Sequence, residues 1–344
     1  MTSSGNDNLA RYARQMRYAP LGEEGQRRLA ASTALIVGCG ALGSVSAGTL
    51  ARAGVGRLRI VDRDFVELTN LQRQMLFDEA DVATDLPKAI AAAEKLRRIN
   101  STTAIEPVVA DVSAANIESL CMGVDVIVDG TDNFETRFLL NDAALAFNIP
   151  WLFGGCLGSE GQAMTIVPAE TPCLRCLMPD PPPPGSTPTC DTAGILAPIV
   201  LAIAAIQSQE AIKILSGNRA AIERRLVVLD LWTGTMRAIR VERLDDCTAC
   251  RRRDFPWLRG ERGGGATVLC GRNAVQIGPG SSTIALEELQ HRLDRVARVT
   301  RNPFLLRAAI DNYVLTVFPD GRAIIGGTDD VSIARSVYAK YVGV

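Results

Sequence analysis

The chain has 344 residues, of which 47% are hydrophobic, and this is enough for one large domain and a smaller one. The formal net charge of −1 argues against a nucleic-acid-binding surface, so we expect no nucleic acid as a partner. The longest apolar run, Ile195 to Ile206, is too short to span a membrane and contains Pro198. Residues 1–8 are polar and lack the apolar region of a signal peptide, so we expect a disordered tail on a cytoplasmic protein that binds no membrane.

The stretch from Ala34 to Asp62 predicts a nucleotide-binding unit. An apolar strand leads into the turn GCGALG, a small-residue helix follows, and a second strand, Arg57 to Val61, ends at Asp62. Asp62 lies where a carboxylate would bond ribose hydroxyls. The glycines allow a tight turn, a close phosphate and close helix–sheet packing, and the helix start offers free N–H groups, at Gly38, Gly40, Ala41 and Gly43. A tight turn in a fold without a ligand is the alternative.

The residues that follow favour a triphosphate over a dinucleotide. The segment Asp64 to Gln74 is polar and cationic where a dehydrogenase would start its next helix, and Arg73 can give paired donors to phosphate oxygens. Lys88 follows Pro87 in the first turn of an alanine-rich helix, where a lysine opposes the helix dipole. A phosphate ligand would explain that position, and a solvent-exposed lysine is the alternative. The nucleotide contacts predicted in the polar segment are Thr69, Asn70, Leu71, Gln72 and Arg73.

Strands and helices continue to alternate, which predicts an α/β fold with a doubly wound, mostly parallel, Rossmann-like sheet. Buried strands are expected at Ala104 to Ala110 and Val124 to Val128, and a helix at Phe134 to Phe147. Ligands of such sheets gather beyond the carboxyl ends of the strands. The motif DGTDN, residues 129–133, falls at one of these ends. Its polar residues Asp129, Asp132 and Asn133 can each cap the helix, but one cap does not need all three.

The second half of this domain continues the sheet. We expect strands at Ile149 to Phe153 and Gln162 to Val167, joined by a glycine-rich loop. A long helix from Gly194 to about Leu215 and two more strands, Leu226 to Leu231 and Met236 to Val241, follow. Arg137 and Asn141 are one helical turn apart, so they are expected to share a face towards the ligand cleft.

Four of the nine cysteines form two Cys-x-x-Cys pairs, and an odd total argues against a disulfide framework. Each pair can bind one tetrahedral metal through a tight knuckle, and four thiolates with no open position suit structural zinc. The pairs are far apart in sequence, so the predicted zinc ion would tie a late loop back to the middle of the chain. A redox dithiol is the alternative. The predicted ligands are Cys173, Cys176, Cys247 and Cys250.

With these motifs, the chain resembles the ThiF/MoeB/HesA family, which is related to ubiquitin-activating enzymes. The likeness rests on GCGALG, VDRDFVELTNLQRQ at 61–74, Pro87-Lys88, DGTDN and the two cysteine pairs, and it covers roughly residues 9 to 250. It implies an ATP-dependent adenylyltransferase domain at 9–262. Its substrate would be the C-terminal Gly-Gly carboxylate of a small ubiquitin-like sulfur carrier, activated as an acyl-adenylate for thiocarboxylate formation.

The resemblance also implies roles for single residues. Arg14, otherwise a residue of a solvated basic helix, would reach the nucleotide of the partner subunit in a homodimer. Asp132 would bind Mg²⁺, Asn133 would contact the nucleotide, and Lys88 and Arg73 would bind the phosphates. Cys190 precedes a helix whose dipole would lower its thiol pKa, and the matching cysteine accepts the acyl group in some branches of the family. A sulfurtransferase or cysteine desulfurase would be a further partner.

After the glycines at 263–265, residues 266–344 predict a small α+β domain. We expect a strand at Ala266 to Ile277, a helix at Ile284 to Val299 and a helix at Asp329 to Tyr341. Between them lie strands at Leu305 to Phe318 and Ala323 to Ile325, joined by a Pro-Asp-Gly turn. Some family members carry a sulfurtransferase module here, but no loop of that kind is evident, so Cys270 is a weak candidate sulfur acceptor.

Three other functions compete with this interpretation. An NAD-dependent oxidoreductase shares the evidence up to Asp62, but it lacks a histidine for hydride chemistry because His291, the only one, is expected on the surface. It also leaves Lys88 unexplained. A non-catalytic scaffold for a ubiquitin-like partner would not need Arg73 and Asp132 together. Within the family, adenylation of another carboxylate stays open, and the sequence does not name the carrier or its pathway.

Overall fold

The computed structural model describes residues 7–182, 193–262, 267–269, 273–278 and 283–343. The chain divides into two compact units, Met1–Pro182 with Ile195–Arg262, and Pro183–Gly194 with Gly263–Val344. The domain boundaries expected from the sequence, 9–262 and 266–344, are not tested by this division and stay a prediction. Each unit is described by itself below.

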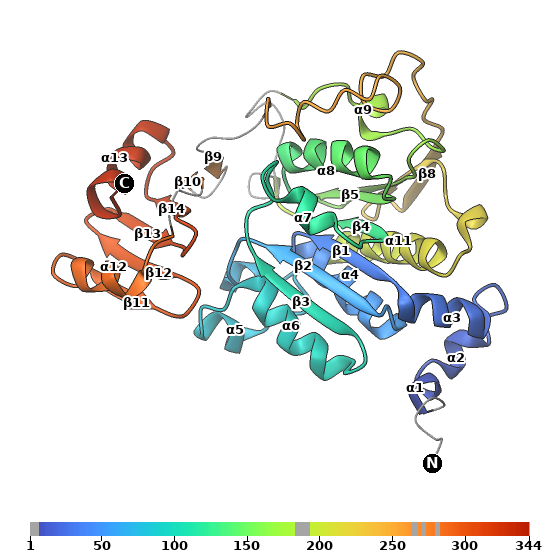
Figure 1. The fold of residues 1–344 in the computed structure, drawn as a ribbon, viewed down its shortest axis with the longest axis horizontal. Helices are drawn as coiled ribbons and strands as arrows, with labels where there is room; N and C mark the ends of the chain where they lie inside the picture. The colour runs from blue at the N-terminus through green and yellow to red at the C-terminus, as the bar shows by residue number, and fades with distance from the viewer. Residues whose placement is uncertain (1–6, 183–192, 263–266, 270–272, 279–282, 344) are drawn as a thin grey trace. The chain divides into compact units, whose positions relative to one another are not determined.

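The first unit is built on an eight-stranded sheet with the order β3-β2-β1-β4-β5-β6-β7-β8 (Figure 1). The five strands from β3 to β5 are parallel and the rest are antiparallel. This confirms the doubly wound, mostly parallel α/β fold, and the order reverses between β1 and β4. The strands are β1 Thr33–Val37, β2 Arg57–Asp62, β3 Ala104–Val109, β4 Val126–Asp129, β5 Trp151–Leu157, β6 Glu160–Ile166, β7 Leu226–Asp230 and β8 Thr235–Ile239.

Helices cover both faces of this sheet. On one face α3 (Gly22–Ala31), α4 (Ala41–Ala53), α6 (Lys88–Ile99) and α11 (Ala197–Leu215) enclose a single apolar cluster. On the other face α7 (Ile117–Cys121) and α8 (Phe134–Phe147) enclose a second cluster. The shorter elements are α1 Asp7–Ala10, α2 Ala13–Met16, η1 Leu68–Asn70, α5 Glu79–Ala83, α9 Leu174–Leu177 and η2 Arg219–Ala221.

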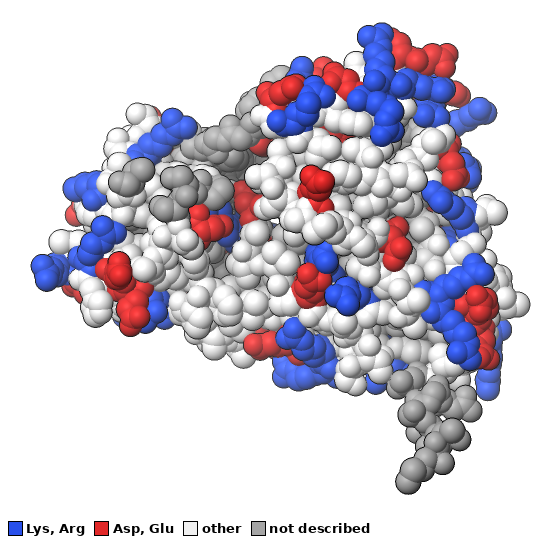
Figure 2. Space-filling model, viewed as in Figure 1, with Lys and Arg blue, Asp and Glu red and all other residues white. Residues whose placement is uncertain are grey.

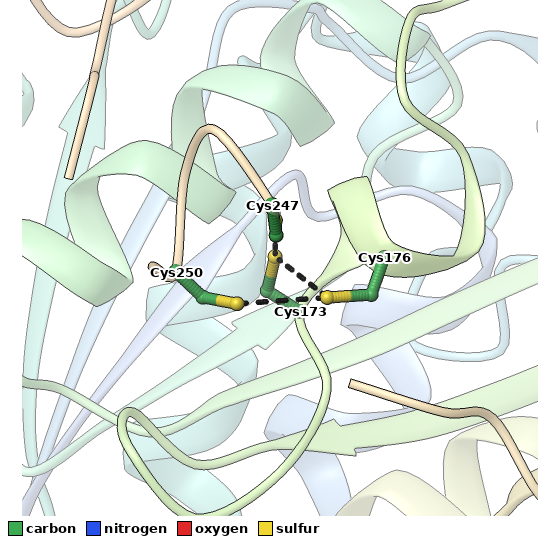
Figure 3. Close-up of side chains that lie close together, drawn as sticks. All are labelled: Cys173, Cys176, Cys247 and Cys250. Atoms are coloured by element: carbon green, nitrogen blue, oxygen red, sulfur yellow. Dashed lines mark hydrogen bonds between the residues drawn. The ribbon is translucent and has the colours of Figure 1, made fainter. Parts of the chain in front are cut away.

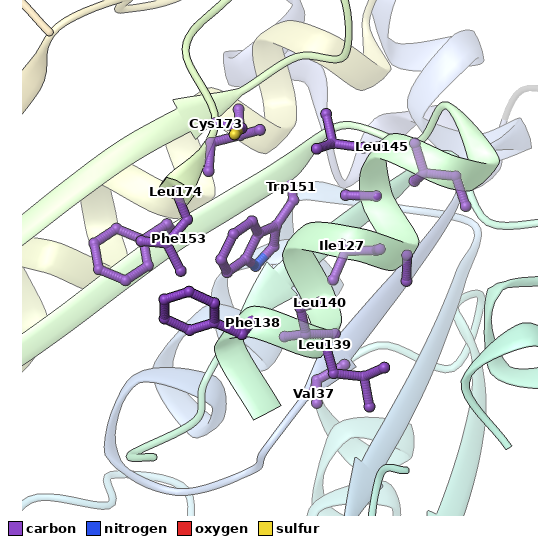
Figure 4. Packing of buried hydrophobic residues seen from close by; sticks show 14 of the residues in the cluster. Val37, Ile127, Phe138, Leu139, Leu140, Leu145, Trp151, Phe153, Cys173 and Leu174 are labelled. Atoms are coloured by element: carbon purple, nitrogen blue, oxygen red, sulfur yellow. The ribbon is translucent and has the colours of Figure 1, made fainter. Parts of the chain in front are cut away.

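Aromatic side chains fill the cluster beneath α8 (Figure 4). Trp151 and Phe138 are both fully buried, and the ring of Phe138 lies 5.5 Å from that of Trp257. The rings of Trp151 and Phe153 meet edge to face at 5.8 Å. Because Trp257 comes from the segment after the second cysteine pair, this cluster fastens that segment onto α8.

One prediction for this sheet is wrong. The glycine-rich segment after Phe153 is not a loop, because β5 continues to Leu157 and pairs with β6 over its whole length. The glycines have a packing role instead. A Cβ at Gly154 would lie 2.5 Å from Gln207 Nε2, and a Cβ at Gly161 would lie 2.4 Å from a side-chain carbon of Ile203. Both neighbours belong to α11, so the glycines let that helix lie close to the strands.

By length and composition alone, one helix in the described ranges, α11, could cross a membrane. Half of that apolar window is buried inside the protein, and the helix packs against α4, β5 and β6. Its apolar composition is therefore explained by its place in the core.

The second unit is a six-stranded antiparallel sheet with the order β11-β12-β13-β14-β10-β9. The helices α12 (Leu286–Leu293) and α13 (Val331–Tyr341) pack on one apolar cluster with the sheet, centred on Val275, Leu289 and Leu315. His291 is exposed, as expected. The strands are β9 Thr267–Leu269, β10 Ala274–Ile277, β11 Arg298–Arg301, β12 Leu306–Ile310, β13 Tyr313–Val317 and β14 Ala323–Gly326.

Three predictions for this unit were too coarse. The expected strand at Ala266 to Ile277 is two strands, β9 and β10, which pair with each other. The expected helix ends at Leu293, since the β-branched residues beyond it form β11. The expected strand at Leu305 to Phe318 turns back on itself at Asp311, whose φ is +52°.

In Figure 2 charged side chains of both signs lie next to one another in groups, with uncharged surface between the groups. Many of them pair locally. Arg259 lies 2.8 Å from Asp254 and 2.6 Å from Glu261, and Arg262 lies 2.6 Å from Asp180. Such exposed pairs contribute little to stability, about 0–1 kcal/mol each, so they act mainly by neutralising the surface.

Candidate nucleotide and metal sites

The glycine turn lies where the strand order reverses, between the carboxyl ends of β1 and β4. Gly38 has a φ of +84°, and a Cβ there would lie 2.7 Å from the carbonyl oxygen of Gly130. A Cβ at Gly43 would lie 1.8 Å from the carbonyl oxygen of Gly38. Backbone therefore packs directly on backbone, and only glycine fits at these positions.

Replacing Gly43 with alanine should lower the free energy of unfolding by about 3 kcal/mol, the upper end of the usual cost of overpacking, because the new methyl group meets a backbone oxygen that cannot move aside. Gly48 on the same helix is the matched control, since nothing lies within 4 Å of its Cβ position. Gly48→Ala should stabilise the protein by about 0.5–1 kcal/mol. Urea unfolding of both variants measures this, and equal stability of the two would contradict the packing described.

The start of α4 faces the turn. Gly40 is the N-cap residue and supplies no side-chain cap, and the helix begins at Ala41. The first N–H groups of a helix have no partner within it and attract a negative group. The side chain of Gln74 lies nearby, with Nε2 3.8 Å from the Cβ position of Gly40. The Gln74 Oε1 atom is buried and has no hydrogen-bond partner in the described part of the chain.

Asp62 ends β2 and is buried beside the turn. Its carboxylate accepts hydrogen bonds from the N–H groups of Cys39, at 2.6 Å, and Asp64, at 2.7 Å. Burial raises the pKa of this carboxyl group, although nearby Lys88 lowers it. Burial also raises the pKa of the Cys39 thiol, so Cys39 stays protonated and is a packing residue. The turn and the acid expected at the ribose thus lie side by side.

The polar segment after Asp62 forms a short helical turn, η1. Asn70 is buried and its Oδ1 accepts a hydrogen bond from the N–H of Glu67, which makes it part of the backbone support. Thr69 and Gln72 are exposed, and Leu71 is half-buried. Arg73 donates from Nη1 to the carbonyl oxygen of Thr69 at 2.9 Å.

Lys88 is buried, with 3% of its surface exposed, so the alternative of a solvent-exposed lysine is wrong. Its Nζ lies 3.3 Å from Asp64 Oδ2, and its backbone N–H donates to the carbonyl oxygen of Asp64. Lys88 is the first residue of α6 and Pro87 is the N-cap. The lysine is therefore held at the unfavourable end of its helix by a carboxylate.

The DGTDN loop contains one cap and one buried ion pair. Asn133 is the N-cap of α8, because its Oδ1 accepts from the N–H of Thr136. Asp129 is buried, and its Oδ2 lies 3.5 Å from Nε of Arg137. Arg137 also donates to the carbonyl oxygens of Thr131 and Gly154. Asp132 is exposed. The loop is therefore supported from beneath, and Asp132 remains on its surface.

The sequence did not predict the role of Gln207, and it led to a wrong position for Asn141. Gln207 of α11 donates from Nε2 to the carbonyl oxygens of Asp129 and Leu152, both at 2.9 Å, and so joins α11 to β4 and β5. Asn141 does not share the face of Arg137 towards the nucleotide, and that prediction is wrong. Its Oδ1 accepts from the N–H of Leu174, beside the cysteine cluster.

Of three further candidates, only one lies in the described residues. Arg14 lies on α2 and is exposed, as a residue that contacts a partner subunit would be. Cys190 and Cys270 lie outside the described residues, so their roles stay predictions.

The four predicted zinc ligands converge (Figure 3). Cys173 is the N-cap of α9, and Cys176 lies within that helix. Cys247 and Cys250 lie in the loop after β8. The sulfur–sulfur distances are 3.8 Å between Cys173 and Cys176, 3.6 Å between Cys173 and Cys247, and 3.5 Å between Cys176 and Cys250. Four sulfurs at about 2.3 Å from a tetrahedral zinc ion lie about 3.8 Å apart. The cluster therefore fits zinc with no open position.

The sheet order, the glycine turn at its reversal and the charged residues at the strand ends define a nucleotide-binding α/β protein with a separate four-cysteine metal site. The family model described as the ThiF family matches residues 12–249. The chain therefore belongs to the ThiF family, which confirms the resemblance carried by the motifs.

Individual relatives agree with this assignment. The sulfur carrier protein ThiS adenylyltransferase of Bacillus subtilis is 46% identical, over 97% of this chain and 99% of that protein. The SAMP-activating enzyme E1 of Haloferax volcanii is 41% identical, over 70% of this chain and 88% of that protein. A crystal structure of E. coli MccB with ATP has a TM-score of 0.61 and 22% identity, covering 70% of this chain and 74% of that chain. At that identity the likeness shows the fold alone.

Proposed function

We propose that the protein is an ATP-dependent adenylyltransferase that activates the C-terminal Gly-Gly carboxylate of a ThiS-type sulfur carrier. The observation that carries this proposal is the 46% identity to the B. subtilis ThiS adenylyltransferase along nearly the whole of both chains. That match extends beyond the ThiF model, which ends at 249, into the second unit. The match to the Haloferax relative covers only 70% of this chain, whereas the match to the B. subtilis relative covers 97%. The longer match also favours a ThiS-type carrier.

In the proposed reaction the carrier carboxylate attacks the α-phosphorus of ATP, and pyrophosphate leaves. The attacking group is already ionised, so the site needs positioning and positive charge rather than a base. Lys88 and Arg73 would bind phosphate oxygens, Asp62 would bind the ribose, and Arg14 of the partner subunit in a homodimer would add a third cation. Asp132, at the exposed surface of its loop, would hold Mg²⁺, which neutralises phosphate charge when bound.

Exchange of radioactive pyrophosphate into ATP tests the proposal directly. Purified protein is assayed with a ThiS-type carrier, with a MoaD-type carrier and with the same ThiS-type carrier lacking its last Gly-Gly. The proposal expects exchange that depends on the intact ThiS-type carrier. Exchange that is equal with the truncated carrier, or absent with every carrier, would refute it.

A hydrophobic hairpin offers a docking surface for the carrier. At the β8 edge of the large sheet, where the described residues add no further strand, the turn after β7 and strand β8 expose large apolar side chains: Leu231, Trp232, Met236 and Ile239. Trp232 is 81% exposed, and every residue of β8 is exposed. Exposed tryptophans and a free strand edge are typical of protein-binding surfaces.

Replacing Trp232 with alanine should raise the KM for the carrier about tenfold and leave the KM for ATP unchanged, because an exposed aromatic anchor is lost far from the glycine turn. Met122→Ala is the matched control, since Met122 is 66% exposed but lies outside the hairpin. Steady-state exchange measured over a series of carrier concentrations, and separately over a series of ATP concentrations, gives the two constants. An unchanged carrier KM in the Trp232 variant would place docking elsewhere.

Replacing Asp132 with asparagine should lower the exchange rate about 100-fold at millimolar Mg²⁺, since one charged ligand of the metal is lost. Raising the Mg²⁺ concentration should recover part of the rate, and ATP binding without the metal should be unchanged. Exchange assays over a series of Mg²⁺ concentrations measure the rate, and calorimetry measures the binding of ATP without the metal. A loss of rate that Mg²⁺ cannot alter would remove Asp132 from the metal site.

The acyl group of the adenylate would next pass to the outer sulfur of a persulfide on a sulfurtransferase or cysteine desulfurase, with AMP as the leaving group. A second thiol, for which Cys190 is the candidate on this chain, would attack the resulting acyl disulfide, so that the thiocarboxylate is released and a disulfide between the two proteins is left. The four-cysteine cluster would hold Zn²⁺ as a structural ion, because four thiolates leave no position for a substrate.

A further inference from the structure

Four carboxylates and two cations meet where β2, β3 and β4 end. Arg63 and Asp64 follow β2 directly, Asp111 follows β3, and Asp132 follows β4. Together with Asp62 and Lys88 these groups carry four negative and two positive formal charges. A nucleotide triphosphate is itself an anion, so its phosphates would enter a region in which acids outnumber bases.

Arg63 lies among the acids. Its Nη1 donates to both oxygens of Asp111, at 3.1 and 3.3 Å, and its Nε lies 3.9 Å from Asp64 Oδ1. Burial lowers the pKa of the guanidinium, but the charges of Asp111, Asp64, Asp132 and Asp62 outweigh burial and raise it. The side chain of Arg63 is 22% exposed, so its ion pair with Asp111 is less screened by water than a pair of fully exposed side chains.

Asp64 is shared between two cations. One oxygen, Oδ1, faces Arg63, and the other, Oδ2, lies 3.3 Å from the Nζ of Lys88. When Lys88 turns to a phosphate, it must give up part of its attraction to Asp64. Leaving a half-buried carboxylate without a cation is unfavourable, because charge in a region of low dielectric needs a partner.

We propose that Arg63 is a positioning residue that keeps Asp64 neutralised while Lys88 moves from Asp64 to the phosphates of the nucleotide. The proposal rests on the proposed function, since it takes ATP as the ligand of Lys88. Asp111 holds the other side of the Arg63 guanidinium and so fixes it next to Asp64. Arg63 acts through Asp64 and Lys88, not by contact with ATP.

The test is a double-mutant cycle read by calorimetric binding of ATP with Mg²⁺, in the absence of a carrier. Arg63→Met should raise the Kd for ATP about tenfold, the size of one interaction energy between charged neighbours. Asp64→Asn removes the charge that Arg63 neutralises, so the Arg63→Met/Asp64→Asn double variant should bind ATP within about threefold of wild type. Rescue by a second substitution is a result that a merely structural role of Arg63 would not give.

Two controls sharpen the test. Arg57→Met removes an arginine at the other end of the same strand, 3.8 Å from Glu106, and should leave the Kd for ATP unchanged. Adenosine lacks phosphates, so Arg63→Met should weaken its binding less than twofold, by about the error of the method.

Equal ATP affinity of Arg63→Met and wild type would overturn the proposal, and so would a double variant as weak as Arg63→Met. An equal loss of ATP and adenosine affinity would overturn it as well, because it would mark general disruption of the site. Wild-type protein that bound no ATP would instead overturn the proposed function itself.

Discussion

Serine at position 176 will remove one zinc ion per chain and lower the melting temperature by about 10 °C or more. Cys176 is one of four cysteines whose sulfur atoms meet at zinc distances, and the two pairs come from parts of the chain that are far apart in sequence. Without the ion the loop after β8 loses its tie to α9, and the Trp257 segment that follows it loosens from α8. Elemental analysis by mass spectrometry and scanning calorimetry measure the two effects.

Cys121→Ser is the matched control for this variant. Cys121 is also buried, but it lies on α7 outside the cluster. It should keep a full complement of zinc and lose only the smaller stability of a buried thiol. Zinc content that is zero in wild type, or unchanged in the Cys176 variant, would contradict the zinc assignment and favour a redox dithiol.

Alanine at Arg73 will lower carrier-dependent pyrophosphate exchange about 1000-fold, the size expected when a positioned donor to developing negative charge is removed. The hydrogen bond from Arg73 to the carbonyl oxygen of Thr69 holds the guanidinium next to η1, near the glycine turn. The stability of the variant should change little, because that bond stays at the surface. Exchange assays and thermal unfolding of the same preparation separate the two properties.

Arg98→Ala provides the comparison for Arg73. Arg98 likewise donates to the carbonyl oxygen four residues earlier, but it is exposed near the end of α6. It should exchange at the wild-type rate. If Arg73→Ala exchanged as fast as Arg98→Ala, Arg73 would not bind the phosphates.

Local patterns were enough to predict the parallel half of the large sheet. The apolar run before Gly38 and the acid at Asp62 mark β1 and β2, and the helix predicted at Phe134 to Phe147 is α8 without any change. The four cysteines were found by spacing alone, since thiols in Cys-x-x-Cys pairs have few other uses in such numbers. These features depend on neighbours in sequence, which a single sequence contains.

The misses depend on neighbours in space. Gly154 and Gly161 were interpreted as loop residues, but they lie in strands. Glycine is required at these two positions because Gln207 and Ile203, from a later helix, occupy the space that a side chain would fill. Asn141 lies one helical turn from Arg137, yet the two serve different sites because α8 runs from the nucleotide loop to the zinc cluster. Arg63 was passed over because its partner Asp111 follows a different strand, β3, and is far from Arg63 in sequence.

The continuous sheet also sets a length. Between β4, which leads to Asp132, and β8 at the free edge there are four strand spacings of about 4.8 Å, or roughly 19 Å. An extended chain advances about 3.3 Å per residue, so roughly six residues cross that span. With its folded body on the Trp232 hairpin, a carrier would reach the nucleotide only with its last few residues. The width of the sheet would then set the minimum length of the carrier tail. A carrier with a shorter tail would dock normally but would not be activated.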